Sequence, residues 1–142
     1  MPHITFSENP KFTPEELLSL YAAVRWEAYT QDSDRLLRAI QRSAFVVAAR
    51  HDERDLVGLV RVITDDTTIC YVQDILVRPE YQGQGLGQAL LARVKDRFAH
   101  VRQMVLLTDD EPTQRDFYER AGFTEASAFQ PGPLRAFVRL QR

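Results

Sequence analysis

The sequence predicts an α+β fold with a central mixed sheet of about six to seven strands, mostly antiparallel, and flanking helices. Three observations support this prediction. Short apolar runs separated by polar turns alternate with segments of helical period. Three of these runs follow one another through short turns, which is typical of antiparallel strands. A later run comes only after a helix, as the connection between parallel strands requires.

Residues 4–6 form a short strand candidate at the start of the chain. The sequence Thr13-Pro14-Glu15-Glu16 then predicts the start of a helix, because it combines a capping box with a proline at the first helical position. Apolar side chains continue with helical period as far as Ala28. Polar residues 32–34 open a second helix, which extends through Ile40.

Three neighbouring strands are predicted in the middle of the chain. Residues 45–49 and 56–63 are strand candidates joined by the polar turn 51–55, an arrangement that predicts a hairpin. A second polar turn, at residues 64–66, leads into a strand over residues 71–77. We therefore expect these three strands to pair antiparallel in one sheet.

The second half of the chain begins with a helix whose apolar side chains recur at four-residue intervals from Leu86 to Phe98. The strand predicted over residues 104–108 follows this helix and should join the sheet in parallel. A helix over residues 112–121 ends at Gly122, because glycine suits the position after the last helical turn. The last two strands are predicted around Phe123 and over residues 134–140.

Length and composition favour one domain and exclude several classes of protein. The 142 residues fit a single domain, and a net charge of −2 gives no reason to expect nucleic-acid binding. Cys70 is the only cysteine, which excludes an internal disulfide, and the three histidines lack metal-ligand spacing. No secretory signal is visible, and no apolar run approaches the roughly 18 residues of a membrane span. We therefore expect a cytoplasmic protein with no metal, no nucleic acid and no membrane among its partners.

The most informative segment is Tyr81-Gln82-Gly83-Gln84-Gly85-Leu86-Gly87, which joins the predicted strand over residues 71–77 to a helix. The first N–H groups of a helix lack internal partners, and the helix dipole favours negative charge there. Glycines also let the main chain approach a phosphate closely. The segment therefore predicts a site for a phosphorylated cofactor, and a glycine-rich turn without a ligand is the alternative.

Two common nucleotide-binding motifs do not match this segment. A kinase-type phosphate loop needs a lysine followed by serine or threonine, and no such pair follows the glycines. The dinucleotide fingerprint needs the spacing Gly-x-Gly-x-x-Gly after the first strand of a βαβ unit, which Gly83, Gly85 and Gly87 do not provide. The spacing therefore excludes both motifs.

Three motifs occur in the order that is usual for one enzyme family. They are Gln82-x-x-Gly85-x-Gly87, the strand from Val72 to Tyr81 with its Val-x-Pro-x-Tyr ending, and Phe117-Tyr118-Glu119-Arg120-Ala121-Gly122-Phe123. They resemble the Gln/Arg-x-x-Gly-x-Gly/Ala signature, the strand that enters it and the Phe-Tyr-x-x-x-Gly-Phe segment of the GCN5-related N-acetyltransferases (the GNAT family). In that family the glycine loop wraps the pyrophosphate of acetyl-CoA.

The resemblance implies a single N-acetyltransferase domain over residues 1–142, which transfers an acetyl group from acetyl-CoA to a primary amine by direct attack in a ternary complex. In this family the fourth and fifth strands splay apart, and the pantetheine arm of the cofactor lies between them. An N–H near Leu76 is the implied donor to the oxyanion. The implied cofactor contacts are Ile75, Leu76, Val77, Gln82, Gly83, Gln84, Gly85, Leu86, Gly87, Gln88, Thr113 and Tyr118. Thr113 stands in for an asparagine that many relatives carry.

Tyr118 is the candidate general acid, because the family places a tyrosine hydroxyl beside the cofactor sulfur. A phenol with a pKa of about 10 can donate a proton to a leaving thiolate while it stays un-ionised at neutral pH. The alternative is that Tyr118 is a core aromatic residue beside Phe117, with a hydroxyl that is simply hydrogen-bonded.

Asp74 is the candidate general base, because it interrupts an otherwise apolar strand and an ammonium group must lose a proton before it attacks. By strand alternation it shares a face with Cys70, Val72 and Leu76. Burial of a carboxylate there is unfavourable unless the carboxylate is paired. Two alternatives stay open: Asp74 pairs with a neighbouring arginine, or a water relay removes the proton.

The resemblance places the acceptor pocket among the first two helices and the last two strands, which offer Trp26, Tyr29, Phe129 and the loop 130–133. An aromatic rim can hold an alkyl or ring amine, so a small-molecule amine is expected rather than a protein lysine. Two other functions stay open: a non-catalytic acyl-CoA sensor on the same fold, and an interaction domain whose glycine turn binds nothing. The family often forms homodimers, so a homodimer is a possible assembly.

Overall fold

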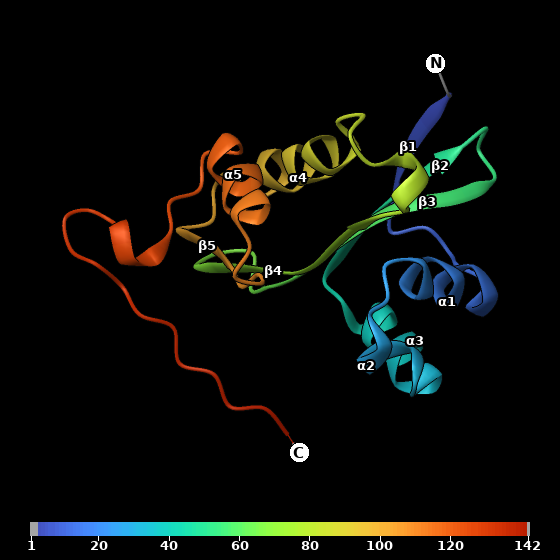
Figure 1. Cartoon of the computed structure of the whole chain (residues 1–142), viewed down its shortest axis with the longest axis horizontal. Coiled ribbons are helices and arrows are strands. Elements are labelled where there is room, and N and C mark those ends of the chain that lie inside the picture. Colours follow the sequence, from blue (N-terminus) through green and yellow to red (C-terminus); the bar gives the residue numbers. More distant parts are fainter. Residues whose placement is uncertain (1–2, 142) are drawn as a thin grey trace. The chain divides into compact units, whose positions relative to one another are not determined.

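The computed structural model of the chain describes residues 3–141 and divides into two compact units. The first unit ends at Leu107, and the second begins at Thr108. Among the described residues, the first unit contains the sheet, four α-helices and a short 3₁₀ helix, and the second contains one α-helix, a short 3₁₀ helix and an extended segment (Figure 1). The single domain expected over the whole chain stays a prediction.

The first unit is built on a five-stranded sheet in the order β1-β2-β3-β4-β5. The strands are β1 (Ile4–Glu8), β2 (Phe45–His51), β3 (Asp55–Thr64), β4 (Ile69–Val77) and β5 (Gln103–Leu106). Strands β1 to β4 pair antiparallel with their neighbours, and β5 pairs in parallel with β4. The predicted hairpin, the antiparallel meander and the parallel return are therefore confirmed.

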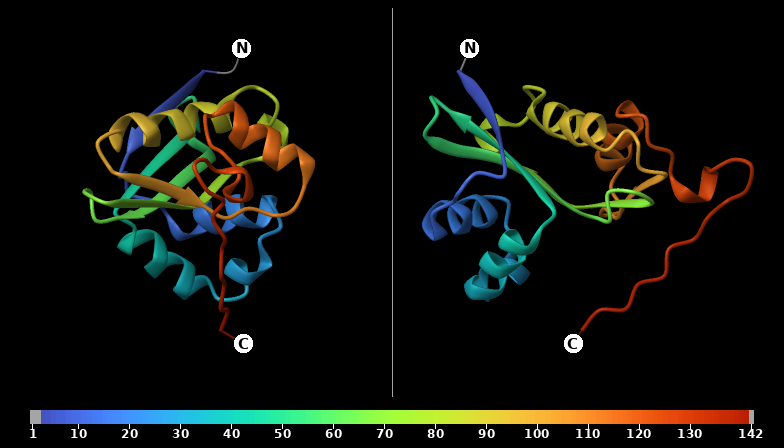
Figure 2. Two further views of the ribbon diagram at one scale, coloured as in Figure 1. Left: turned by 90° about the vertical axis from the view of Figure 1, so that its left-hand side faces the viewer. Right: turned by 180° about the vertical axis from the view of Figure 1, so that it is seen from behind.

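Helices cover both faces of this sheet. Figure 2 shows α4 on one face, with α1, α2 and α3 on the other. The helices of this unit are α1 (Pro14–Ala23), α2 (Glu27–Thr30), α3 (Ser33–Arg42) and α4 (Leu86–Arg97). The buried side chains of α4 are Leu86, Leu90, Leu91 and Val94, which include three positions of the predicted apolar face. Among residues 3–141, no helix combines the length and the apolar character that crossing a membrane requires.

Helix α1 begins as the sequence predicts but ends earlier. The Thr13 hydroxyl accepts from the N–H of Glu16 at 3.2 Å, and the Glu16 carboxylate accepts from the N–H of Thr13 at 2.7 Å. The helix stops at Ala23 and does not reach Ala28, because Arg25 adopts a left-handed φ of 61°. The short helix α2 follows this break.

The sheet has fewer strands than the sequence predicts. Within the described residues, neither the residues around Phe123 nor residues 134–140 form strands. Residues 134–140 are extended, but a strand also needs a neighbouring strand for its main-chain hydrogen bonds. Residues 134–140 have the alternating side chains of a strand, but within the described residues they pair with no other strand.

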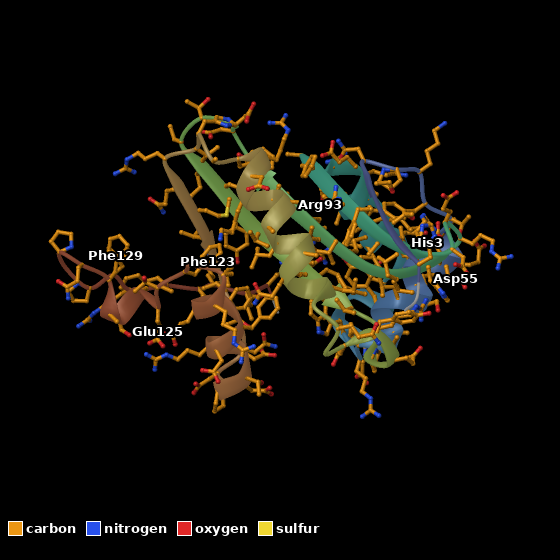
Figure 3. All side chains as sticks on the ribbon, turned by 90° about the horizontal axis from the view of Figure 1, so that it is seen from above. His3, Asp55, Arg93, Phe123, Glu125 and Phe129 are labelled. Carbon is orange, nitrogen blue, oxygen red and sulfur yellow. The ribbon has the colours of Figure 1, made fainter. Side chains whose placement is uncertain are left out.

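Phe123 has a different role, since it closes the helix α5 (Pro112–Arg120) of the second unit. Its N–H donates to the carbonyl of Tyr118 at 3.0 Å, and the N–H of Gly122 donates to the carbonyl of Glu119 at 3.0 Å. With Gly122 at a φ of 91°, these two bonds form a Schellman motif. Figure 3 shows Phe123 beside α5, with Phe129 farther along the same unit.

A β-bulge in β4 decides which side chains meet in the middle of the sheet. Arg61 of β3 pairs with Asp74 of β4, whereas the next residue, Val62, pairs with Val72. Gln73 is therefore the extra residue of the bulge, and bulges of this kind redirect side chains. The bulge places the two charged residues opposite each other, where Arg61 is only 5% exposed and Asp74 only 3%.

Candidate active site

The glycine segment, residues 82–88, connects β4 to α4 after the short 3₁₀ helix η1 (Pro79–Tyr81). Gly83 and Gly85 have left-handed φ values of 79° and 84°, which residues with a Cβ adopt only with strain. A Cβ added to either glycine would meet nothing within 4 Å. The space beside the main chain is therefore open, and a ligand can approach the backbone closely.

The main-chain N–H groups of residues 83–87 have no hydrogen-bond acceptor among the described residues. Gly85 is the N-cap of α4 and has no side chain with which to cap the helix. The unpartnered donors and the positive end of the helix dipole are thus available to an anion.

Gln82 differs from the residues that follow it. Its N–H donates to the carbonyl of Pro79 at 3.2 Å, and its side-chain Nε2 donates to the carbonyl of Val77 at 2.9 Å. Gln82 therefore holds the start of the glycine segment against the end of β4. The donors left over for a ligand begin at Gly83.

The pairing between β4 and β5 ends before β4 does. Their ladder ends at the pair Val72–Leu106, whereas β4 stays paired with β3 as far as Val77. On the side of β5, residues 73–77 have no strand partner within the described part of the chain. Ile75, Leu76 and Val77 lie on this open edge, where an extended ligand could add as a strand does.

Asp74 is the centre of a buried polar network in the first unit. Its Oδ2 accepts from Arg61 Nε at 2.6 Å and from the hydroxyl of Tyr21 at 2.9 Å, and its Oδ1 accepts from the hydroxyl of Tyr29 at 2.9 Å. Arg61 also donates to the hydroxyl oxygens of Tyr29 at 3.3 Å and Ser43 at 3.2 Å. The pairing with an arginine, one of the alternatives for Asp74, is therefore present.

Both phenols of the network hold their protons firmly. Burial raises the pKa of Tyr21, and the charge of Asp74 raises it further. Burial and Asp74, in the same order, raise the pKa of Tyr29. The exposed side chain of Gln73 donates to the hydroxyl of Tyr29 at 3.2 Å. This hydroxyl therefore connects the buried carboxylate to the surface at the bulge.

Two of the three predicted acceptor residues lie together beside this network. The ring centroids of Trp26 and Tyr29 are 6.1 Å apart, and those of Tyr21 and Tyr29 are 5.2 Å apart. Both Trp26 and Tyr29 pack partly buried against the core. Phe129 belongs to the second unit and is 42% exposed.

Sequence reasoning missed two of the three residues that bind Asp74 directly. Arg61 carries the signal that marked Asp74, since it is a charged residue in an apolar strand, and the two could have been matched on that ground. Tyr21 gave no such signal, because its helical spacing assigns it to the core. Tyr21 is indeed fully buried, and its hydroxyl also binds Asp74.

Tyr118 lies near the end of α5, where its ring packs edge-on against two phenylalanines. The centroid distances are 5.0 Å to Phe117 and 6.1 Å to Phe123. Burial raises the pKa of Tyr118 to about 12. Its hydroxyl has no protein hydrogen-bond partner among the described residues, and it reaches solvent. Thr113 lies in the first turn of the same helix.

The chemistry of the remaining candidates is limited. Burial raises the pKa of the Cys70 thiol to about 11, so this thiol is not a ready nucleophile at neutral pH. Within residues 3–141, no group of three or more histidine, cysteine, aspartate or glutamate side chains could hold a metal ion.

Comparison with known sequences identifies one family. Residues 8–131 match the family described as Acetyltransferase (GNAT) domain. A GCN5-related N-acetyltransferase of Arabidopsis thaliana is 34% identical over 76 residues, which make up 52% of this chain and 29% of that protein. The histone acetyltransferase TAP1 of Glycine max is 28% identical over 133 residues, 84% of this chain and 55% of that protein. The chain thus spans about a third to a half of the length of these relatives.

Solved structures agree with this assignment. A GNAT-family acetyltransferase from Streptococcus pneumoniae has a TM-score of 0.84 at 28% identity, over 99% of both chains. An aminoglycoside N-acetyltransferase in complex with CoA shares the fold, with a TM-score of 0.68 at 18% identity over 100% of this chain and 97% of that one. The matched range includes the glycine segment, strands β4 and β5 and the Tyr118 motif. This chain belongs to the GNAT family of acetyltransferases.

Proposed function

We propose that the chain transfers the acetyl group of acetyl-CoA to the primary amine of a small molecule, by direct attack in a ternary complex. The observation that carries this proposal is the run of unpartnered N–H groups in residues 83–87, at a helix start with two left-handed glycines. A diphosphate needs several donors on one open stretch of main chain. Bound acetyl-CoA supplies a thioester, which is an activated acyl donor.

The residues around the glycine segment fit such a molecule. In this proposal residues 83–88 hold the diphosphate, while Gln82 keeps the segment attached to β4. The open edge of β4 at Ile75, Leu76 and Val77 holds the pantetheine arm, and the N–H of Leu76 is the proposed donor to the thioester carbonyl. Thr113 is a further proposed contact to the arm.

Tyr118 is the proposed general acid for the leaving sulfur. Its pKa of about 12 keeps the phenol protonated throughout the neutral range. Its hydroxyl donates to no protein group among the described residues, so the proton is not already committed. This observation favours a catalytic role over the alternative of a hydrogen-bonded core tyrosine.

Asp74 is the proposed base, and Tyr29 is the group through which it exchanges protons. The hydroxyl of Tyr29 donates to Asp74 Oδ1 at 2.9 Å and accepts from the exposed Gln73. In this relay the ammonium replaces the side chain of Gln73 at the hydroxyl oxygen of Tyr29, and the Tyr29 proton moves to Asp74 Oδ1 as the ammonium proton arrives on that oxygen. Arg61 and Tyr21 hold the other carboxylate oxygen in place. A water relay is the competing account.

A small amine is the proposed acceptor because aromatic rings lie beside a buried carboxylate. The rings of Trp26 and Tyr29 can attract an alkylammonium through cation–π interaction, and Phe129 is the third proposed contact. Relatives of this fold include an aminoglycoside N-acetyltransferase and a histone acetyltransferase. A test of the acceptor should therefore contain both small amines and a lysine peptide.

The proposal is tested by thermal unfolding with acetyl-CoA, followed by thiol release with a panel of amines. A ligand at 100 times its dissociation constant stabilises the folded state by about 2.7 kcal/mol. Gly85→Ala forces a Cβ onto a φ of 84°, so we expect weaker binding of acetyl-CoA. Gly132→Ala is the matched control, since its added Cβ also meets nothing within 4 Å and its φ is ordinary.

Two outcomes would contradict the proposal. If acetyl-CoA does not stabilise the wild-type chain, the glycine segment does not bind it. If acetyl-CoA binds but no amine releases the thiol, the chain is a non-catalytic acyl-CoA sensor. Release with the lysine peptide alone would replace the small amine by a protein acceptor.

A further inference from the structure

The hydroxyl group of Tyr29 has all of its hydrogen-bonding positions filled by protein groups. It donates its proton to Asp74 Oδ1 at 2.9 Å. It also accepts from Arg61 Nη2 at 3.3 Å and from Gln73 Nε2 at 3.2 Å. A phenol that donates its proton and accepts from two donors has no lone pair left for a ligand. A ligand therefore reaches this oxygen only by displacing one of the two donors.

The two donors to Tyr29 differ in how firmly they are held. Arg61 is buried, and it also donates through Nε to Asp74 at 2.6 Å and through Nη1 to the hydroxyl of Ser43 at 3.2 Å. Gln73 is exposed, and the bond to Tyr29 is the only hydrogen bond of its side chain among the described residues. Displacement of Arg61 would break the buried ion pair, whereas displacement of Gln73 breaks one exposed bond. Gln73 is therefore the donor that a ligand replaces.

The bulge in β4 explains why Gln73 reaches this hydroxyl. In a regular strand, neighbouring side chains point to opposite faces of the sheet, so Gln73 and Asp74 could not contact the same group. Gln73 is the extra residue of the bulge, and a bulge redirects side chains. As a result, the exposed carboxamide and the buried carboxylate both contact the hydroxyl of Tyr29.

We propose that Gln73 is a specificity-determining residue, whose carboxamide occupies the position at Tyr29 that the acceptor ammonium must take. This inference rests on the proposed function, in which the ammonium binds the hydroxyl oxygen of Tyr29. Water and neutral ligands offer a bond of about the same strength as the carboxamide, so they gain little by replacing it. A charged N–H donor makes a bond roughly twice as strong. The carboxamide therefore keeps neutral groups away from this oxygen and gives way to an ammonium.

The proposal has a consequence for affinity that can be measured. Because the ammonium and the carboxamide compete for one oxygen, Gln73 weakens the binding of every ammonium that uses this oxygen. A variant without the N–H donor of Gln73 should bind such an ammonium more tightly. A neutral, exposed hydrogen bond is a modest competitor, so we expect the dissociation constant to fall about 2- to 10-fold. If Gln73 instead helped to hold the ammonium, the dissociation constant would rise.

The chain contains its own reporter for this binding. Trp26 is its only tryptophan, and the ring centroids of Trp26 and Tyr29 are 6.1 Å apart. Its fluorescence therefore responds to a cation at Tyr29 without acetyl-CoA and without turnover. The probes are n-butylammonium, which has N–H donors, and tetramethylammonium, which has none. Both can lie against the aromatic rings through cation–π interaction, but only butylammonium competes with Gln73 for the hydroxyl oxygen.

The test titrates wild type and Gln73→Met with each probe at neutral pH and follows the fluorescence of Trp26. Methionine has a side chain of similar length without an N–H group, so this variant removes the donor and keeps the bulk. We expect the dissociation constant of butylammonium to fall about 2- to 10-fold and that of tetramethylammonium to stay the same. Gln103→Met is the matched control, because Gln103 is an exposed glutamine at the start of β5, and neither constant should change.

An unchanged or higher dissociation constant for butylammonium in Gln73→Met would overturn this proposal. Equal tightening of both probes would overturn it as well, because the effect would then not come from a hydrogen bond. If butylammonium binds neither protein, Tyr29 is not part of an ammonium site and the proposal is wrong.

Thiol release with the amine panel separates this inference from the proposed function. Release by a wild type that does not bind butylammonium at Trp26 would leave acetyl transfer standing and overturn the role of Gln73 alone. Selective tightening of butylammonium without any thiol release would overturn acetyl transfer and leave Gln73 as the competitor at an ammonium site. Circular dichroism of each variant confirms that it is folded.

Discussion

Residues up to Leu107 enclose an apolar core on both faces of a sheet, whereas residues from Thr108 onward bury only Ala121 among the described apolar side chains. Among its described residues the first unit has four α-helices, the 3₁₀ helix η1 and five strands, and the second has α5 and the 3₁₀ helix η2 (Ala126–Ala128). The glycine segment and the Asp74 network therefore stand on densely packed elements. Tyr118 stands on a helix that is closed by its own local motif.

Under the proposed function, the two units have different tasks. Donors that must hold a diphosphate need fixed positions, and a packed scaffold provides them. A general acid needs mainly a protonated hydroxyl that is not bonded elsewhere, which a helix with few packed neighbours can supply. We therefore expect substitutions of polar groups in the first unit to reduce stability, and substitution of Tyr118 in the second to reduce the rate.

The largest effect is expected for Tyr118→Phe. General acid catalysis contributes about 10²- to 10⁴-fold, so turnover should fall by about that factor. The free energy of unfolding should hardly change, because the phenol has no protein hydrogen bond to lose among the described residues. Thiol release, urea unfolding and the affinity for acetyl-CoA measure the three quantities.

A matched control lies in the first unit. Tyr81→Phe removes the same atom from a hydroxyl that is 2.9 Å from His51 Nδ1. It should lower the free energy of unfolding by about 1 kcal/mol and leave turnover nearly intact. If Tyr118→Phe keeps wild-type turnover, Tyr118 is a packing residue. The expectation that substitutions in the second unit reduce the rate would then be wrong.

The next effect is expected in the buried network. Arg61→Met leaves the carboxylate of Asp74 buried without its cation, and Asp74→Asn leaves Arg61 without its anion. Each single substitution should lower the free energy of unfolding by about 3–5 kcal/mol, measured in urea. The double variant should lose much less than the sum, because neither charge is then left unpaired.

The same double variant separates structure from chemistry at Asp74. If it is stable but inactive, the carboxylate takes part in proton removal. If it recovers both stability and the wild-type pH profile of the rate, Asp74 is a structural residue and a water relay removes the proton.

The smallest effect is a loss of stability at alkaline pH. In the unfolded chain a tyrosine titrates near a pKa of about 10, whereas Tyr118 is raised to about 12 and Tyr21 is raised as well. Above the unfolded pKa the unfolded state releases protons that the folded state keeps, so stability falls as the pH rises. Urea unfolding should show no change from this source below about pH 10 and a decline above it. A free energy of unfolding that stays constant above about pH 10 would contradict the burial of the Tyr118 and Tyr21 side chains.

Elements with local signals were predictable from the sequence. The capping box at Thr13, the apolar face of α4 and the hairpin between β2 and β3 depend on residues close together in the chain, and all three are confirmed. The end of α1 at Ala23 was not predictable, because a single left-handed residue, Arg25, stops a run that is still periodic. The strands expected around Phe123 and over 134–140 failed because pairing is not a local property.

The candidate site divides in the same way. The glycine segment could be predicted from the sequence, because its hydrogen-bond donors are consecutive main-chain groups and the glycines among them are a recognisable pattern. The partners of Asp74 could not be predicted in this way, since they come from β3, α1 and α2, which are far apart in the sequence. The bulge at Gln73 brings one of them, Arg61, opposite Asp74. The extra residue of the bulge in β4 decides which β3 residue faces Asp74, and the spacing of residues in the sequence does not predict the bulge.

The Schellman motif that ends α5 makes the position of the Tyr118 side chain depend on Gly122, a residue without functional groups. The carbonyl of Tyr118 accepts from Ala121 at 3.1 Å and from Phe123 at 3.0 Å, and the Phe123 ring returns against the phenol. Gly122 is the pivot of this arrangement, at a φ of 91°. A side chain at position 122 would be strained at this φ, so we expect a substitution there to loosen the last turn and to shift the ring of Tyr118. If Tyr118 is the general acid, such a substitution lowers the rate although every proposed reactive group is still present in the sequence.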